Sequence, residues 1–193
     1  TQQSVKKDLY EAPDYYQVDD LLTDEHKLIR DTARQWVKKE VSPIIDDYAQ
    51  RAQFPKQLIK GLADIGAFGP TIPTKYGGAG LDYISYGLLM QEIERGVSGI
   101  RSTASVQGSL VMYPIYAYGS EEQKQKYLPK LASGEMMGCF GLTEPNFGSN
   151  PSDMASTIKD QGSHYILNGA KLWISNAPFA DIAVVWAKDD NGD

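Results

Sequence analysis

The hydrophobic pattern of this chain changes character near Met136. Before that point apolar residues recur every three or four positions, as in helices that bury one face. From Met136 onward the apolar runs are short and rich in β-branched and aromatic residues, which is typical of strands joined by turns. Helices first and strands second indicate an α+β fold, with an all-helical domain followed by an antiparallel β-domain. We expect an N-terminal arm over residues 1–18, the helical domain over 19–134 and the β-domain over 135–193.

Capping residues mark the ends of the expected helices. Ser, Thr and Asp side chains accept hydrogen bonds from the first backbone N–H groups of a helix, and Gly tolerates the left-handed backbone that often ends one. We expect helices to begin near Thr23, Pro55, Asp82, Ile100 and Ser120. The matching ends are expected near Pro43, Gly66, Ile93, Gly119 and Ala132. The Gly-rich stretch at 77–80 follows no strand and lacks phosphate-loop spacing, so we interpret it as a tight turn.

The β-part contains the sequence pattern of a β-hairpin and ends in a turn pattern that no further strand follows. Strands are expected over Ala155–Lys159, His164–Leu167, Lys171–Ser175 and Ile182–Ala187. The turn residues Asp160, Gln161 and Gly162 separate the first two and predict a β-hairpin. The last strand runs into Asn191-Gly192, a strong turn signal with no returning strand. We therefore expect the β-domain to be incomplete and the chain to be a fragment.

Composition narrows the class of partner. The 19 Lys and Arg residues against 25 Asp and Glu residues give a net charge of −6, which argues against nucleic acid. Cys139 is the single cysteine, so no disulfide can form within the chain, and this fits a reducing compartment. No apolar run approaches membrane-spanning length, and the first residues do not resemble a signal peptide. His26 and His164 lack companions at metal-ligand or triad spacing, so we expect structural roles and no metal site.

Arg101 is the only charged residue between Gly96 and Ser120. The helix around it is otherwise apolar or small, so we expect it to be buried on nearly all sides. A buried guanidinium needs an anionic partner. Two interpretations remain open. One is an internal ion pair with Glu92 or Glu94, and the other is a clamp for a ligand carboxylate or phosphate.

Two stretches of the β-part carry candidate ligand groups. The segment "CFGLTEPNFGSN" at 139–150 is an apolar run that ends in hydroxyl, amide and glycine residues. The segment at 171–176 alternates, which places Trp173 and Ser175 on one face and Ile174 on the other. An aromatic wall beside a hydroxyl donor suits a flat heteroaromatic cofactor. An ordinary polar loop followed by a half-buried strand is the alternative interpretation.

Taken together, these segments resemble the acyl-CoA dehydrogenase family. "FGLTEPNFGS" at 140–149 and "NGAKLWISN" at 168–176 resemble its two flavin-binding signatures. Further similarity lies in "GPTIPTKYGGAGLDYISYGL" at 69–88, "SVQGSLVMYPIYAYGSEEQKQKYLPKLASGE" at 105–135 and "DIAVVWAK" at 181–188. The resemblance covers roughly residues 20 to 190 and is nearest to the glutaryl-CoA dehydrogenase branch. It implies the helical N-terminal domain and about half of the middle β-domain.

The resemblance implies that FAD lies against the β-domain. The implied cofactor-binding residues are Phe140, Gly141, Leu142, Thr143, Glu144, Gly148, Ser149, Trp173, Ile174 and Ser175. Thr143 would face the N1/O2 side of the flavin, where fixed donors stabilise the charge of the reduced ring. Trp173 would wall one flavin face. Ser175 stands where the family has a Thr that binds N5, so it keeps the donor and loses the methyl that restricts its rotamer.

The implied substrate residues are Arg101, Ser102, Glu94 and Ser149. By resemblance, Arg101 and Ser102 bind the distal carboxylate of glutaryl-CoA, Glu94 lies near that carboxylate, and Ser149 also touches the thioester side. The implied reaction is α,β-dehydrogenation of the acyl-CoA, followed by loss of carbon dioxide to give crotonyl-CoA. The implied partners are an electron-transfer flavoprotein and, in a homotetramer, further copies of the chain. The implied location is the cytoplasm of a bacterium or the mitochondrial matrix of a eukaryote.

The resemblance also sets limits. The family's catalytic Glu would lie beyond Asp193, so residues 1–193 alone are expected to be inactive and contain no catalytic residue. Asn150 stands where the family usually has Asp, and Phe147 replaces a small or polar residue. An acyl-CoA dehydrogenase for uncharged short or branched chains is the nearest alternative. A flavin oxidase and a non-catalytic association module are more distant ones.

Overall fold

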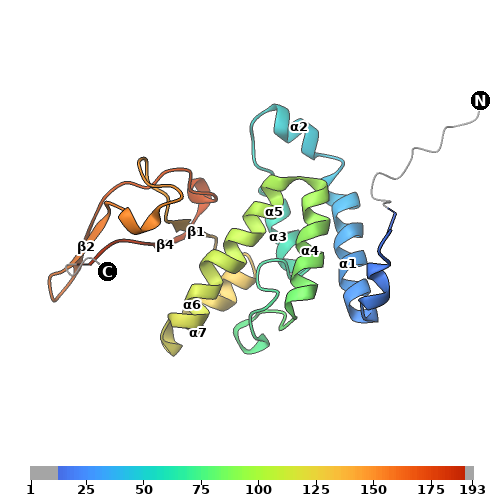
Figure 1. Ribbon diagram of the computed structural model, residues 1–193, viewed down its shortest axis with the longest axis horizontal. Coiled ribbons are helices and arrows are strands. Elements are labelled where there is room, and N and C mark those ends of the chain that lie inside the picture. Colours follow the sequence, from blue (N-terminus) through green and yellow to red (C-terminus); the bar gives the residue numbers. More distant parts are fainter. Residues whose placement is uncertain (1–12, 190–193) are drawn as a thin grey trace, which may run out of the picture.

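The computed structural model describes residues 13–189, with the helices gathered at one end and the strands at the other (Figure 1). The helical part consists of η1 (Val18–Leu21), α1 (Asp24–Trp36), η2 (Val37–Val41), α2 (Ile45–Gln50), α3 (Leu58–Asp64), η3 (Thr74–Tyr76), α4 (Tyr83–Gly96), α5 (Ser98–Ser105), η4 (Val106–Met112), α6 (Tyr113–Tyr118) and α7 (Glu121–Ala132). The second part consists of β1 (Gly138–Gly141), η5 (Pro151–Asp153), β2 (Thr157–Asp160), β3 (Tyr165–Asn168), η6 (Ala177–Phe179) and β4 (Ile182–Val185). This order confirms the predicted α+β arrangement.

Three predicted helix caps are present. The Thr23 hydroxyl accepts a hydrogen bond from the His26 backbone N–H, at 3.2 Å. The Ser120 hydroxyl accepts one from the Gln123 N–H at 3.2 Å, and the Gln123 side chain returns one to the Ser120 N–H. Asp82 accepts a hydrogen bond from the Ser85 N–H at 2.8 Å, at the start of α4. Each cap satisfies a donor that has no partner within its own helix.

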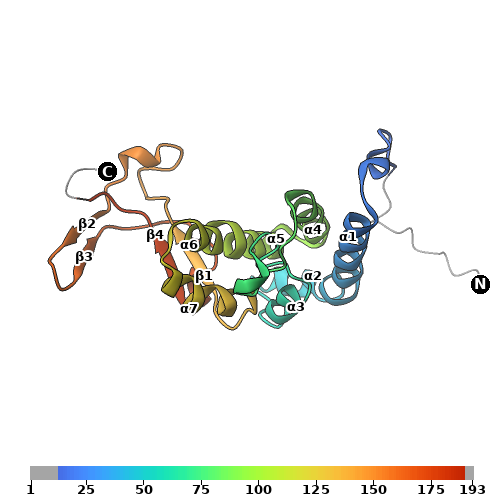
Figure 2. The ribbon, with the colours of Figure 1, turned by 90° about the horizontal axis from the view of Figure 1, so that it is seen from below.

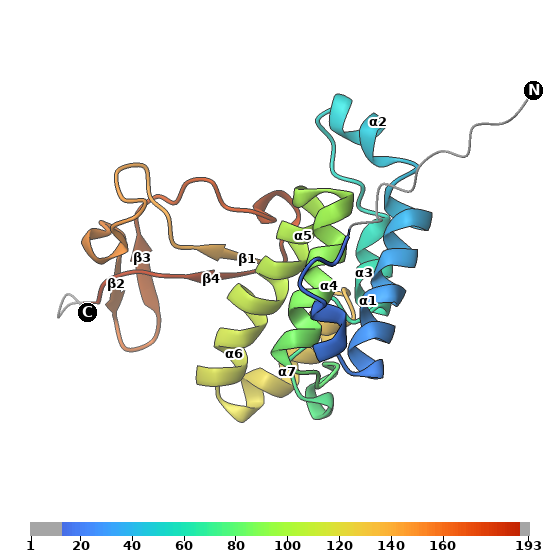
Figure 3. The same ribbon diagram turned by 45° about the vertical axis from the view of Figure 1, so that its right-hand side comes forward.

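The helical core is a single apolar cluster in which α1 packs on α4 and α7 closes the far side. Its largest fully buried apolar side chains are Tyr76, Phe68, Leu62, Ile72, Leu89, Ile93, Ile100, Met112, Leu128 and Leu131. They come from the helical stripes and from the loop before α4. In Figure 3, α2 stands apart from this bundle. The described part of the chain has no helix with the length and apolarity needed to cross a membrane.

α5, η4 and α6 form one continuous helical run from Ser98 to Tyr118, and its middle segment η4 is π-helical. The expectation that this run is buried nearly all round is wrong. One side faces the core through Ile100, whereas Leu110 and Tyr113 are exposed on the other side. Gly108 touches the loop before α4, because a Cβ there would lie 2.6 Å from the Phe68 carbonyl oxygen.

The strands form two separate pairs. β2 and β3 pair antiparallel with Thr157 opposite Asn168, which confirms the predicted hairpin. β1 and β4 pair in parallel with Gly138 opposite Ile182. This pair differs from the expected antiparallel arrangement, because the long connection between the two strands lets both run in the same direction. Figure 2 shows the hairpin at the end of the molecule away from the helices, while β1 contacts η4.

The predicted strand over Lys171–Ser175 is wrong. These residues are irregular, because Trp173 (φ 60°) and Asn176 (φ 68°) adopt left-handed backbone conformations that interrupt an extended chain. The predicted tight turn at 77–80 is confirmed by Gly77 (φ 82°) and Gly80 (φ 65°). Most of the expected N-terminal arm and the Asn191-Gly192 turn lie outside the described residues.

Candidate functional site

The segments at 139–150 and 171–176 lie against each other. The Leu172 backbone N–H donates to the Thr143 carbonyl oxygen at 2.9 Å. The Lys171 ammonium donates to the Leu142 carbonyl oxygen at 3.1 Å and to the Glu144 carboxylate at 2.8 Å. Two stretches separated by twenty residues of chain are thus joined at the end of β1.

Glu144 is buried, with 5% of its surface exposed, and is fully engaged by the protein. Its carboxylate accepts hydrogen bonds from Lys171 and from the backbone N–H groups of Ala155 (2.6 Å) and Ser156 (2.9 Å). The Lys171 hydrogen bond, followed by that of Ser156, lowers the pKa of Glu144 to about 2. Glu144 therefore holds the loop together, and its expected part in cofactor binding would be to shape that loop.

The hydroxyl groups of Thr143, Ser149 and Ser175 make no hydrogen bond to other described residues, so each is available to a ligand. Trp173, two residues before Ser175, is 85% exposed and has a left-handed backbone. That conformation is unusual for a bulky residue and is concentrated at functional sites. Exposed aromatic surface and free hydroxyl donors fit a flat ring with polar edges, as in a flavin.

The remaining expected cofactor residues lie in β1 or in the segments that follow it. Phe140 lies in β1 and contacts the Trp186 ring edge-on, with ring centroids 6.1 Å apart. Gly141 ends β1 opposite Val185. Gly148 has nothing within 4 Å of the position a Cβ would occupy, so the backbone there is open to close approach. Leu142 and Ile174 flank Thr143 and Ser175 in sequence.

Arg101 has a partner within the protein, which corresponds to the first of the two interpretations. Its Nε donates to the Glu94 carboxylate at 2.6 Å, and its Nη1 donates to the Ser105 hydroxyl at 3.1 Å. The Arg101 hydrogen bond, followed by that of Ser98, lowers the pKa of Glu94. About a third of the Arg101 side chain is exposed (34%), so the guanidinium remains accessible. Ser102 follows it and is half-buried.

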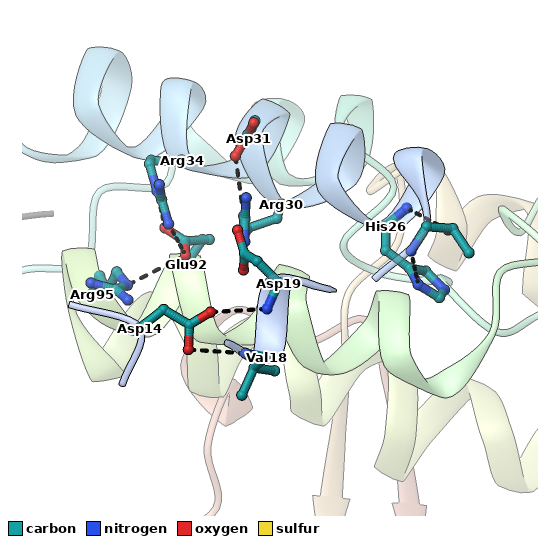
Figure 4. Close-up of polar contacts among 10 residues, drawn as sticks. Asp14, Val18, Asp19, His26, Arg30, Asp31, Arg34, Glu92 and Arg95 are labelled. Carbon is teal, nitrogen blue, oxygen red and sulfur yellow. Dashed lines mark hydrogen bonds and ion pairs between the residues drawn. The ribbon is translucent and has the colours of Figure 1, made fainter. Parts of the chain in front are cut away.

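Glu92, the other candidate partner of Arg101, instead forms ion pairs with Arg34 and Arg95. It is fully buried and accepts two hydrogen bonds from Arg34 of α1, both at 2.9 Å. Arg95 lies 3.3 Å away on the other side (Figure 4). This cluster ties α1 to α4. His26 is structural as expected, because it caps α1 and its Nε2 lies 2.9 Å from Asp82.

Two buried amide side chains connect the Arg101 helix to the surface at the end of β1. Gln107 Nε2 donates to the carbonyl oxygens of Leu131 (2.9 Å) and Met136 (2.8 Å), and its Oε1 accepts from the Gly138 N–H (2.8 Å). Asn176 Nδ2 lies 3.3 Å from the Thr103 carbonyl oxygen and 3.2 Å from that of Gly138. Sequence reasoning did not single out either residue. The one sequence feature that could have pointed to them is that each is an amide residue with mainly apolar or turn-forming neighbours.

The same helical run also borders a cavity of about 180 Å³. Its walls are Gly69, Pro70, Thr71, Ile72, Tyr83, Tyr86, Gly108, Ser109 and Tyr113. The Tyr86 and Ser109 hydroxyls form a hydrogen bond of 2.7 Å at its edge. The described residues contain no group of three side chains that could hold a metal ion.

A helical domain joined to a small β-part that carries accessible hydroxyls and an exposed Trp fits an enzyme that binds a flavin. Residues 23–135 match the family model described as acyl-CoA dehydrogenase, N-terminal domain, and residues 139–193 match that of the middle domain. The chain belongs to the acyl-CoA dehydrogenase family, which confirms the resemblance. FAD is the cofactor of that family.

Known relatives differ in substrate. A 3-(aryl)acrylate reductase of Clostridium sporogenes is 43% identical over 87% of this chain and 45% of its own length. The human mitochondrial short-chain specific acyl-CoA dehydrogenase is 38% identical over 88% of this chain and 41% of its own. A crystal structure of a glutaryl-CoA dehydrogenase from Mycobacterium smegmatis in complex with FADH2 is 47% identical, with a TM-score of 0.88, over 91% of this chain and 45% of that one. The chain thus spans less than half the length of these relatives.

Proposed function

We propose that this chain is part of an FAD-dependent enzyme that dehydrogenates an acyl-CoA, with glutaryl-CoA as its substrate. The observation that carries the proposal is the link between two groups of residues. Arg101 and Ser102 lie on a helix that Asn176 joins directly to the segment containing Trp173 and Ser175. The residues proposed to bind the substrate carboxylate and those proposed to face the flavin are thereby linked through one side chain.

The proposed roles follow from the chemistry of each side chain. FAD, when bound, supplies the acceptor for the hydride that leaves the acyl β-carbon. Thr143, Ser149 and Ser175 would hold it through their free hydroxyls, and Trp173 would cover one face of its ring. Arg101 would bind the distal carboxylate of the substrate by charge-assisted hydrogen bonds. Ser102 and Glu94 would border that carboxylate, and Ser149 would also contact the thioester.

The base that removes the α-proton would come from outside residues 1–193, as would the groups that complete the cofactor site. Purified residues 1–193 alone are therefore expected to give no dye reduction with glutaryl-CoA. In the full-length enzyme we propose that electrons pass to an electron-transfer flavoprotein, that the assembly is a homotetramer, and that the product after decarboxylation is crotonyl-CoA. The domain division proposed is 19–134 for the helical part and 135–193 for the partial β-part.

The test compares substrates in the full-length enzyme. Arg101→Ala is expected to lower kcat/KM for glutaryl-CoA about 30-fold or more, because truncating a charge pair with the substrate loses its full interaction. The same change should lower kcat/KM for butyryl-CoA less than about threefold, because that substrate has no distal carboxylate. Arg51→Ala is the matched control, since Arg51 lies at the end of α2 and pairs locally with Asp47. Equal losses for both substrates would overturn the glutaryl-CoA assignment.

A second candidate is a dehydrogenase or reductase for uncharged acyl-CoA substrates. The observation that favours it is the Glu94 pair, because Arg101 already has an anionic partner without a ligand. The names of the Clostridium sporogenes and human relatives point to aryl and short acyl substrates. Butyryl-CoA or an arylacryloyl-CoA turned over faster than glutaryl-CoA would establish this alternative. A full-length protein that purifies without flavin and ignores all three substrates would instead support an association module.

A further inference from the structure

We infer that Asn176 is a positioning residue that sets the distance between the cofactor segment and the substrate helix. The inference rests on the proposed function, because it assigns Trp173 and Ser175 to the cofactor and Arg101 and Ser102 to the substrate. Its geometric part, which concerns how the two segments are held, stands on contacts within the chain.

Asn176 joins three separate parts of the chain. Its side chain is buried, with 5% of the residue exposed, and Nδ2 donates to two backbone carbonyl oxygens. The Thr103 oxygen belongs to α5 and lies 3.3 Å away, and the Gly138 oxygen belongs to β1 and lies 3.2 Å away. The Asn176 carbonyl oxygen in turn accepts from the Phe179 N–H at 3.0 Å, which starts η6. One residue therefore connects the helix, the strand and the irregular segment.

The requirements at this position select asparagine. The backbone is left-handed (φ 68°), a conformation that Gly, Asn and Asp adopt at little cost. The two acceptors require two N–H donors on one short side chain, which the primary amide of Asn provides. Asp would place a carboxylate against two carbonyl oxygens, and Gly would provide no donor at all. Asn is the residue that meets both requirements.

The contacts lie close to the proposed ligand groups in sequence. Ser175 is bonded directly to Asn176, and Thr103 directly follows Ser102. A displacement of Asn176 would therefore pass to Ser175 through one peptide unit. Gln107, one helical turn after Thr103, binds the Gly138 N–H while Asn176 binds the Gly138 carbonyl. The strand that leads into the cofactor segment is thus held to the helix from both sides of one residue.

The experiment compares Asn176→Gly and Asn176→Asp in the full-length enzyme. The Gly variant can keep the left-handed backbone but loses the two N–H donors of the amide. The Asp variant keeps the side-chain volume but replaces those donors with a carboxylate oxygen, which accepts hydrogen bonds. Gln161→Gly is the control, because Gln161 is an exposed residue in the hairpin turn whose side chain makes no hydrogen bond to another described residue. The readouts are amide hydrogen exchange over residues 171–179, the absorption spectrum of bound flavin, kcat, KM and melting temperature.

Both Asn176 variants are expected to speed exchange over 171–179 about tenfold and to lower kcat about tenfold, because two hydrogen bonds of ordinary strength are lost. The flavin spectrum should shift, and KM should change less than kcat. The control should match the unmodified protein. If the Gly variant does not fold, the isosteric Asp variant carries the comparison.

A lower melting temperature with unchanged exchange, spectrum and kcat would overturn the inference, because it would reduce Asn176 to a general stability contact. A failure of the proposed function can be distinguished from a failure of this inference. If the unmodified enzyme binds no flavin or ignores acyl-CoA, the exchange result still decides whether Asn176 holds the segment. If the enzyme is active and both variants behave as the control does, Asn176 has no positioning role.

Discussion

The Lys171 ammonium lies 2.8 Å from the buried Glu144 carboxylate, with 12% and 4% of the two side chains exposed. This ion pair joins the two segments that carry the candidate cofactor residues. Because Glu144 also accepts the Ala155 and Ser156 backbone N–H groups, it fixes the start of the path toward β2 as well. The Glu144 carboxylate thus connects both segments of the candidate site and the chain that leads to β2.

Replacing Lys171 by Met should destabilise the protein, because the Lys171 side chain is largely buried against Glu144. The change leaves the buried Glu144 charge with backbone donors alone, and uncompensated buried charges are strongly unfavourable. We expect the melting temperature to fall by about 5–10 °C. The control is Lys159→Met, on the exposed face of β2, which should change it by less than about 2 °C. A fall of equal size in both variants would show that the ion pair contributes nothing specific.

Glu144 should also shape the stability of the protein in acid. Its pKa is lowered from 4.5 to about 2 in the folded chain, and that of Asp82 is lowered from 3.8 to about 2. A lowered pKa means that the folded state favours the charged form, so this stabilisation is present above the unfolded pKa and is lost as the pH falls through the folded pKa. We expect melting temperatures to drop between about pH 4.5 and pH 2. The Glu144→Gln variant should have a lower melting temperature at neutral pH, and its melting temperature should fall less as the pH decreases. Curves of melting temperature against pH that run parallel for the two proteins would contradict this role of Glu144.

Sequence patterns predicted the helices of the fold well because helix ends depend on local contacts. Thr23, Asp82 and Ser120 each bind a backbone N–H three residues away, so the relevant partners are visible in the sequence. The irregular segment at 171–176 was predicted to be a strand because its alternation is regular. At its end, Asn176 has a left-handed backbone and its side chain contacts Thr103 and Gly138, which are distant in the sequence, so no local pattern contains these contacts.

The candidate site was predictable in its residue types and less so in its pairings. The sequence left Arg101 with two possible partners, because α4 and α5 are interrupted at Val97 and the rotation between them is set by packing. Glu92 is occupied by Arg34, which lies 58 positions earlier in the chain. Once Glu92 is taken, Glu94 remains as the partner of Arg101. That Glu92 pairs with Arg34 and not with Arg101 follows from the tertiary structure, and the spacing of residues in the sequence does not show it.

Two glycines should respond oppositely to substitution by alanine. A Cβ on Gly78 would lie 2.0 Å from the Ile72 carbonyl oxygen, so Gly78→Ala must displace the turn and should cost more than about 2 kcal/mol. A Cβ on Gly87, within α4, would meet nothing within 4 Å. Gly87→Ala should therefore stabilise the protein by about 0.5–1 kcal/mol through helix propensity. Urea unfolding of the two variants measures both effects, and a stable Gly78→Ala protein would refute the contact.

Gln107 should be the most sensitive polar residue in the helical core. It is fully buried, and its side chain makes three hydrogen bonds, to the Leu131 and Met136 carbonyl oxygens and to the Gly138 N–H. Gln107→Ala leaves those three backbone groups unpaired away from water and opens a cavity, so we expect a loss of about 2–4 kcal/mol in urea unfolding.

Gln125→Ala is the matched control for that change, because Gln125 lies on the exposed face of α7 and its amide bonds only to Glu121, at 3.0 Å. It should cost less than about 0.5 kcal/mol. Hydrogen exchange at Gly138 should also accelerate in Gln107→Ala alone, since the Gln107 oxygen is the acceptor of that N–H. The prediction fails if the two variants have equal unfolding free energies and the Gly138 amide is still protected from exchange. In that case water replaces the Gln107 amide without cost, and apolar packing holds η4 and β1 together.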